Sequence, residues 1–187
     1  VIGYDIRKSS LEISEALIKG LTDAGADVVN IGLCGTEMIY FSTPFLNADG
    51  GIMITASHNP PEYNGMKFVK KDSVPVGYDS GLNVVEEMIL KNDLAEISSK
   101  KGTVEKFDVM EAFINNLSKF YDPKKIKQFK VVVNAGNGCA GLSLNAIESR
   151  LPIKMIKIFN EPDSDFPNGV PNPLLTENRK PTIDAII

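Results

Sequence analysis

The most informative stretch of this chain is ITASHNPPEYNGMK at residues 54–67. An apolar run at residues 51–54 leads into this stretch and is typical of a short buried strand. Small and turn-forming residues follow at once, which predicts a rigid loop at the end of that strand. In open α/β sheets, ligands bind outside the carboxyl ends of the strands, so the loop suits a binding site. The loop carries a hydroxyl at Ser57, the only histidine of the chain at His58 and a lysine at Lys67.

Strand and helix patterns alternate along the whole chain. Apolar runs predict strands at residues 1–4, 27–31, 51–55, 66–69, 130–134 and 153–159. Helical stripes predict helices at residues 11–24, 38–46, 82–91, 108–120, 142–150 and, as a short start, 181–187. Ser9 or Ser10 is expected to cap the first helix and Thr36 the second.

This alternation predicts an α/β protein with a mixed, mostly parallel sheet sandwiched by helices. A second, partial α/β domain is expected to follow, which divides the chain into domains at residues 1–105 and 106–187. The tight turn at residues 135–141 is expected to join the first strand of the second domain to its helix.

Composition indicates an ordinary soluble globular protein, with 43% hydrophobic and 24% charged residues among 187. The formal net charge of −4 gives no basic footprint for nucleic acid, although a site for small anions can be locally basic. The sequence has neither a membrane-length apolar run nor a signal-type N-terminus, so a cytoplasmic protein without a membrane partner is expected. Cys34 and Cys139 are expected to be reduced thiols.

At residues 55–67 the chain resembles the phosphoserine loop of the α-D-phosphohexomutase superfamily, which includes the phosphoglucomutases and phosphomannomutases. The family pattern is T-A-S-H-N-P followed by an aromatic residue, N-G and K, and the chain matches it at every point. GYDIRKSS at residues 3–10 is similar to the family's G-x-D-x-R-x-S segment, and GTEMIYF at residues 35–41 is most similar to the bacterial phosphomannomutase branch. Further resemblances lie in VVNAGNGCAG at residues 132–141, which opens the family's second domain, and in FPNG at residues 166–169.

The resemblance implies an isomerase that interconverts mannose 6-phosphate and mannose 1-phosphate. A phosphoserine donates its phosphoryl group to the hexose phosphate, the bisphosphorylated intermediate reorients, and the other phosphate returns to the serine. A hexose 1,6-bisphosphate is the implied activator, and a monomer or weak dimer is expected. A phosphoglucomutase or an enzyme that accepts both sugars is the alternative within the class, and a non-catalytic sugar-phosphate-binding relative is the alternative outside it.

By resemblance, Ser57 is the phosphoryl carrier, since a phosphoserine holds a charge of about −1.5 to −2 near neutral pH. Lys67 is expected to act as a general acid or base at the sugar hydroxyl, or as a clamp on a shared phosphate. His58 is expected to line the substrate site. A Ser57–His58 dyad of the hydrolase type is not expected, because neighbouring side chains in an extended loop point apart.

Three further residues are candidates for binding substrate or phosphate. Arg7 follows the first predicted strand, and two roles remain open for it: it binds phosphate, or it braces the serine loop by pairing with Asp5. Asn59 and Asn64 can both donate and accept hydrogen bonds, and are also expected to hold the shape of the loop.

The resemblance also implies Mg²⁺, held by the serine phosphate and by three aspartates of a D-G-D-x-D-R segment. Those aspartates are expected beyond residue 187, so Ser57, through its phosphate, is the only residue of this chain that is expected to bind the metal. The chain is therefore expected to be the first domain, without its first strand and helix, and part of the second domain of a four-domain enzyme. On its own it is expected to be inactive.

Overall fold

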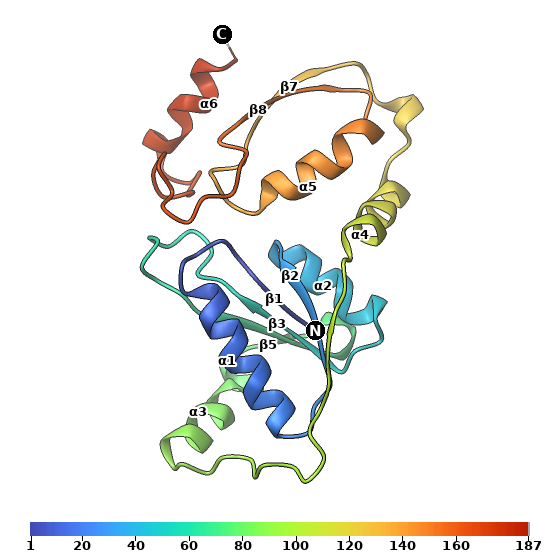
Figure 1. Cartoon of the computed structure of the whole chain (residues 1–187). Coiled ribbons are helices and arrows are strands. Elements are labelled where there is room, and N and C mark those ends of the chain that lie inside the picture. The colour runs from blue at the N-terminus through green and yellow to red at the C-terminus, as the bar shows by residue number, and fades with distance from the viewer. Residues whose placement is uncertain (187) are drawn as a thin grey trace.

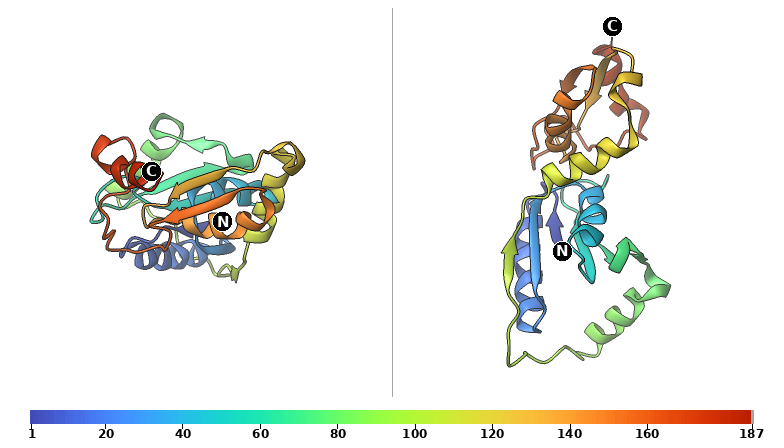
Figure 2. Two further views of the ribbon diagram at one scale, coloured as in Figure 1. Left: turned by 90° about the horizontal axis from the view of Figure 1, so that it is seen from above. Right: turned by 90° about the vertical axis from the view of Figure 1, so that its right-hand side faces the viewer.

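The computed structural model describes residues 1–186 as two α/β units that follow one another along a long axis (Figure 1 and Figure 2). The first unit holds a six-stranded sheet and the second a two-stranded sheet. Helix α4 (Met110–Leu117) lies where the two units meet. The N-terminus lies in the first unit, and the chain leaves the second unit at its far end (Figure 1).

The first sheet has the strand order β5-β4-β3-β1-β2-β6. Its strands are β1 (Ile2–Tyr4), β2 (Val28–Leu33), β3 (Gly50–Ile54), β4 (Met66–Lys70), β5 (Pro75–Val76) and β6 (Val104–Lys106). Strand β1 runs parallel to β2 and β3, and β2 runs parallel to β6, whereas β4 is antiparallel to both of its neighbours. The predicted mixed, mostly parallel sheet is confirmed.

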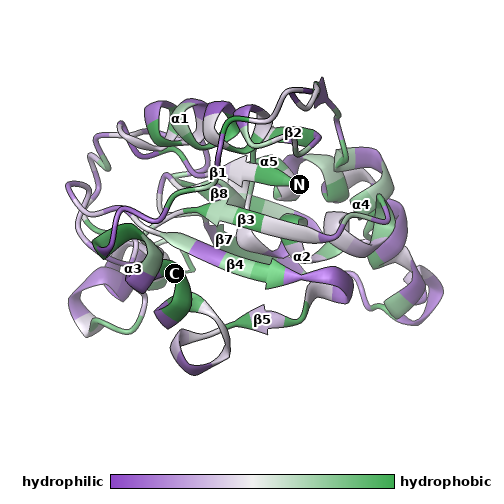
Figure 3. Ribbon diagram, turned by 90° about the horizontal axis from the view of Figure 1, so that it is seen from below, coloured by the Kyte–Doolittle hydropathy of each residue, from purple (hydrophilic) through white to green (hydrophobic). Residues whose placement is uncertain are grey.

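Helices cover both faces of this sheet. These are α1 (Ser10–Asp23) and α2 (Thr36–Phe45), whereas α3 (Leu82–Leu90) has no buried residue. Adjacent residues of β3 point to opposite faces: Ile54 packs beneath α1, and Met53 packs with α2. Seen from below, α1 lies on one side of the central strands and α2 on the other, with hydrophobic colouring along the strands between them (Figure 3).

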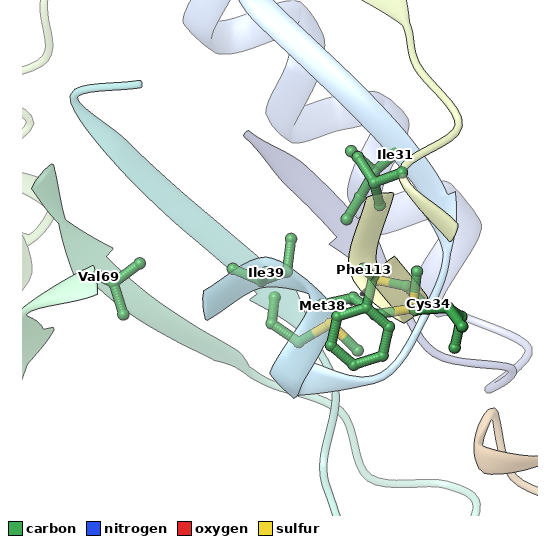
Figure 4. Close-up of a cluster of buried hydrophobic side chains, with 9 residues drawn as sticks. Ile31, Cys34, Met38, Ile39, Val69 and Phe113 are labelled. Atoms are coloured by element: carbon green, nitrogen blue, oxygen red, sulfur yellow. Dashed lines mark hydrogen bonds between the residues drawn. The ribbon is translucent and has the colours of Figure 1, made fainter. Parts of the chain in front are cut away.

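The main hydrophobic core crosses from the first unit to the helix that joins the units. Met38 and Ile39 of α2 share one buried cluster with Phe113 and Ile114 of α4 (Figure 4). Ile147, the last residue of α5 (Ala140–Ile147) in the second unit, packs against the same cluster. Because residues of both units contribute to this cluster, the units are held together by apolar contact as well as by the chain that connects them.

The second unit is a parallel β–α–β arrangement followed by a short helix. Strand β7 (Lys130–Asn134) pairs in parallel with β8 (Lys154–Ile158), and α5 (Ala140–Ile147) connects them. The last helix, α6 (Lys180–Asp184), begins one residue before the predicted position, and residue 187 lies outside the described residues. No helix within residues 1–186 is long and apolar enough to cross a membrane.

Several local predictions are wrong. Thr36 is the first residue of α2 and Gly35 holds the cap position, so Thr36 does not cap that helix. The predicted cap of α1 is confirmed in position, since Ser9 holds the cap position, but its side chain makes no capping bond and the hydroxyl of Ser10 bonds to Asp5. Strands β5 and β6 were not predicted, because each is short and neither carries an apolar alternation.

Candidate active site

The predicted loop lies at the carboxyl edge of the first sheet. Tyr4 of β1 is in register with Ile54 of β3, and the amide of Asp5 donates to the carbonyl of Ile54 at 3.0 Å. The two segments that leave these parallel strands therefore start side by side. Thr55 donates its amide to the carbonyl of Gly65 at 2.9 Å, which closes the base of the loop.

Ser57 stands exposed on this loop, in a backbone conformation that serine seldom adopts. Its φ is 55°, in the left-handed region, and its amide donates to the hydroxyl of Thr55 at 2.9 Å. A non-glycine residue in this region costs of order 1–3 kcal/mol and persists only when its surroundings determine it. The contacts that determine it come from the segment after β1.

Arg7 holds the main chain of the loop. One terminal nitrogen of its guanidinium donates to the carbonyls of Pro60 and Tyr63, at 2.6 and 3.1 Å. The other donates to the carbonyls of Ser57 and Asn59, at 2.9 and 2.8 Å. Four carbonyl oxygens of one loop thus converge on a single planar cation, which fixes their relative positions.

Asp5 holds Arg7 in turn. Its carboxylate accepts from Nε of Arg7 at 3.1 Å, from the amide of Arg7 at 3.0 Å and from the hydroxyl of Ser10 at 2.6 Å. The side chain of Arg7 is only 1% exposed, and all of its guanidinium N–H groups are used. Of the two roles left open by the sequence, the geometry is that of the brace, and no N–H of Arg7 is left for a phosphate.

Asn64 ties the loop to the start of α1. Its side-chain nitrogen donates to the hydroxyls of Ser9 and Ser10, both at 2.9 Å, and its side-chain oxygen accepts from the amide of Gly65 at 2.8 Å. Asn59, by contrast, is exposed and meets the network through its carbonyl group. Both residues shape the loop, and the serines that anchor Asn64 are site residues that sequence reasoning missed.

The side chains of Ser57 and His58 point toward each other, which corrects the expectation of an extended loop. Ser57 Oγ lies 3.2 Å from Nδ1 of His58, within hydrogen-bond distance. The reason is the left-handed backbone of Ser57, which turns the chain so that consecutive side chains no longer diverge. The imidazole therefore lies beside the hydroxyl that the sequence singles out.

Lys67 lies on β4, opposite Met53 of β3 in the antiparallel register. Its side chain is exposed, and within residues 1–186 its ammonium has no hydrogen-bond or ion-pair partner. The lysine is thus next to the loop along the chain but is not part of the network that braces it.

A cavity of about 620 Å³ lies between His58 and the second unit. Of the six predicted site residues, His58 alone lines this cavity in the described part of the chain. Its other polar walls, which the sequence analysis missed, are Asn134, Asn168, Asn172, Asn178, Arg179 and Thr182. Its volume is that of a small-molecule site, and a wall rich in amide groups suits a ligand with many hydroxyls.

The residues present do not by themselves make a metal centre. Within residues 1–186, no three histidine, cysteine or carboxylate side chains gather where they could hold a metal ion. Ser57, once phosphorylated, would offer a phosphate oxygen to a hard cation, but it would be a single ligand. A complete metal site would therefore need further ligands from outside these residues.

Neither cysteine belongs to the candidate site as a nucleophile. Burial raises the pKa of the Cys34 thiol above its ordinary range and raises the pKa of Cys139 to about 12. Both thiols are free and buried, which matches the reduced cysteines expected from the sequence. A protonated, buried thiol is a poor nucleophile, so the chemistry of the site rests on Ser57 and its neighbours.

Comparison with known proteins gives a consistent result in both units. Residues 1–96 match the family model described as phosphoglucomutase/phosphomannomutase, alpha/beta/alpha domain I, and residues 111–187 match that of domain II. A phosphomannomutase from Escherichia coli is 44% identical over 193 residues, which cover all of this chain and 43% of that protein. A phosphomannomutase from Vibrio cholerae serotype O1 is 43% identical over 191 residues, which cover 41% of its length.

A solved structure has the same fold. The crystal structure of a phosphoglucomutase/phosphomannomutase family protein from Burkholderia thailandensis aligns with a TM-score of 0.85 at 30% identity. The alignment covers 98% of this chain and 40% of that one. The chain thus spans less than half the length of the relatives it matches.

Proposed function

The chain belongs to the phosphoglucomutase/phosphomannomutase family, and from this premise we propose that it carries the phosphoserine loop of a cytoplasmic phosphomannomutase. The reaction is the interconversion of mannose 6-phosphate and mannose 1-phosphate. The similarity to bacterial proteins named phosphomannomutase supports mannose as the sugar. Because the chain spans only part of those relatives, the activity, the substrate and the activator, a hexose 1,6-bisphosphate, are all proposals.

One observation carries the assignment of Ser57. Its hydroxyl is exposed, while the backbone around it is fixed by the buried guanidinium of Arg7. A group that gives and takes a phosphoryl group must be open to the substrate and yet held in one place, since correct positioning supplies much of the rate of such a transfer. The loop meets both requirements.

The transfer proceeds in two balanced steps. In the first, the P–O bond to Oγ of phospho-Ser57 breaks and a P–O bond to the oxygen of a free sugar hydroxyl forms, while the proton of that hydroxyl passes by way of Lys67 to Oγ of Ser57. In the second step the hexose 1,6-bisphosphate has turned round: its other phosphoryl group transfers to Oγ of Ser57, and the proton of the Ser57 hydroxyl passes by way of Lys67 to the sugar oxygen that the phosphoryl group leaves. The net result moves one phosphate between two hydroxyls of the same sugar.

His58 and the cavity account for substrate binding in this proposal. The imidazole lies beside Ser57 Oγ and also lines the cavity, so it can contact the sugar phosphate at the point of transfer. Asn168 and Asn172 line the same cavity, and the donor and acceptor groups of their side-chain amides suit sugar hydroxyls. We propose domains at residues 1–105 and 106–187, with this cavity between them, in a monomer or weak dimer.

The test is a coupled assay of the full-length protein with mannose 6-phosphate or glucose 6-phosphate, each with its hexose 1,6-bisphosphate. The proposal predicts turnover of mannose phosphate that is lost in Ser57→Ala. Faster turnover of glucose phosphate would replace the sugar assignment with that of a phosphoglucomutase. Binding of both sugars without turnover of either would indicate the non-catalytic relative.

A further inference from the structure

The loop at residues 163–169 of the second unit reaches back to the residue that braces the Ser57 loop. The centroid of the Phe166 ring lies 5.5 Å from Cζ of Arg7, within the range at which a guanidinium is attracted to an aromatic face. Phe166 is 6% exposed, and it is the one buried residue between positions 142 and 186. An aromatic side chain from an otherwise accessible segment is thus inserted against the first unit.

From this contact we propose that Phe166 is a positioning residue for the Ser57 loop. The N–H groups at the edge of the Arg7 guanidinium are bonded to the loop and to Asp5, and Cζ of Arg7 lies over the face of the Phe166 ring. The ring excludes water from these hydrogen bonds and holds the guanidinium plane in one orientation. The second unit therefore sets the shape of the Ser57 loop through one side chain.

The backbone of Phe166 supports the inference independently. Its φ is 44°, a left-handed conformation that is a true outlier for a bulky aromatic residue. The amide of Phe166 donates to Asp163 at 3.1 Å, and its carbonyl accepts from Gly169 at 2.9 Å. Such a conformation persists where surrounding contacts over-determine it, and here it aims the ring at Arg7.

A neighbouring contact also joins the segment around Arg7 to the loop around Phe166. Lys8, next to Arg7, forms an ion pair with Asp165, next to Phe166. Both side chains are largely exposed, so the pair adds little stability, but it places the same two segments face to face. Asn168, two residues after Phe166, lines the cavity and donates to Asn137 at 2.8 Å. One loop thus forms a wall of the cavity and the support of Arg7, which connects cavity and serine loop.

Amide hydrogen exchange of this chain tests the positioning role without any assay of activity. The amides of Asn59 and Tyr63 bond within the loop, to Ala56 at 3.0 Å and Pro60 at 3.1 Å, and they report on its opening. Phe166→Leu keeps an apolar side chain but removes the aromatic face, and should speed exchange at both amides about tenfold. Phe166→Tyr keeps the face and should stay close to the wild type.

Two controls make the outcome decisive. The amide of Ala24, bonded to Gly20 at 3.0 Å at the end of α1, reports on the rest of the first unit and should not change. Phe120→Leu removes an aromatic side chain that is 79% exposed, and should leave Asn59 and Tyr63 unaffected. Equal acceleration at Ala24, equal effects of leucine and tyrosine at position 166, or no acceleration at all would each overturn the proposal.

For catalysis, the inference rests on the proposed phosphoryl transfer at Ser57. In the full-length protein, Phe166→Leu should then lower kcat more than it raises KM, with rescue by Phe166→Tyr. If exchange responds as expected but no variant or wild type turns over sugar phosphate, the positioning role stands and the proposed function fails. If activity is present and Phe166→Leu leaves kcat unchanged, the catalytic consequence of the positioning role is wrong.

Discussion

The guanidinium of Arg7 donates a hydrogen bond of 2.9 Å to the carbonyl oxygen of Ser57, 50 residues further along the chain. This bond joins the end of β1 to the loop that leaves β3. It explains how an exposed serine can keep a left-handed backbone, and it makes the loop depend on a residue that contacts no substrate in the proposed mechanism.

Arg7→Met should destabilise the chain by about 3–5 kcal/mol, because it leaves the carboxylate of Asp5 and four loop carbonyls without their buried partner. Urea unfolding measures the change. Arg150→Met is the matched control: that arginine is 28% exposed and pairs with the exposed Glu111, so a loss within about 1 kcal/mol is expected. Equal losses in the two variants would contradict the bracing role of Arg7.

Lys67→Ala in the full-length protein should lower kcat by about 10²–10⁴-fold if the lysine transfers the sugar proton. Stability should change little, because the side chain is exposed. Lys67→Arg keeps the positive charge but does not readily give up a proton, so poor rescue indicates proton transfer and good rescue indicates a phosphate clamp. Steady-state kinetics decide the matter: a change confined to KM would remove Lys67 from the chemical step.

Two helical glycines should respond in opposite directions to alanine. A Cβ at Gly20 of α1 would meet nothing within 4 Å, so Gly20→Ala should stabilise the chain by roughly 0.5–1 kcal/mol. A Cβ at Gly141 of α5 would lie 1.8 Å from the carbonyl oxygen of Asn160, which is backbone and cannot turn away. Gly141→Ala should therefore destabilise by about 1–3 kcal/mol or more, and thermal unfolding of the two variants compares them directly.

The buried thiols should make the stability of the chain fall as the pH rises into the alkaline range. Burial raises the pKa of Cys139 to about 12 and also raises that of Cys34, whereas an unfolded thiol titrates near ~8.5. Between these values the folded state binds more protons than the unfolded state, so the free energy of unfolding should fall as the pH rises. Below pH ~8.5 the thiols do not make the free energy of unfolding depend on pH.

Urea unfolding across this pH range, for the wild type and for Cys139→Ala, checks the thiol effect. The variant should show a weaker decline, because one of the two titrating groups is gone. A thiol reagent should label the folded chain slowly and the urea-unfolded chain quickly at mildly alkaline pH. Rapid labelling of the folded chain would contradict the burial of these cysteines.

Much of the fold could be predicted, because the strands that build the centre of the sheet are apolar and end in recognisable turns. Strand β3 and the loop after it were found from composition alone. Strand β6, with the sequence VEK, was not, since its strand character comes from pairing with β2 and not from its own side chains. Thr36 was wrongly predicted as a cap because α2 begins at Thr36 itself, two residues before its predicted start at residue 38.

The residues of the candidate site could be predicted from the sequence, but the contacts between them could not. Ser57, His58 and Arg7 stand in segments whose composition and motifs are visible in the sequence. The contact between Ser57 and His58 depends on a positive φ at a serine, which no sequence pattern announces. The contact of Phe166 with Arg7 joins distant segments, so it appears only once both units are folded.

The central claim is that Ser57 carries the phosphoryl group, and mapping phosphate on the full-length protein by tandem mass spectrometry tests it most directly. After incubation with a hexose 1,6-bisphosphate, the account predicts one phosphoryl group on Ser57, which is lost to excess hexose monophosphate and is absent from Ser57→Ala. Ser57→Ala should stay folded, because a small exposed side chain carries little packing energy. Turnover with an unmodified Ser57, or with the phosphoryl group on a different residue, would contradict the account.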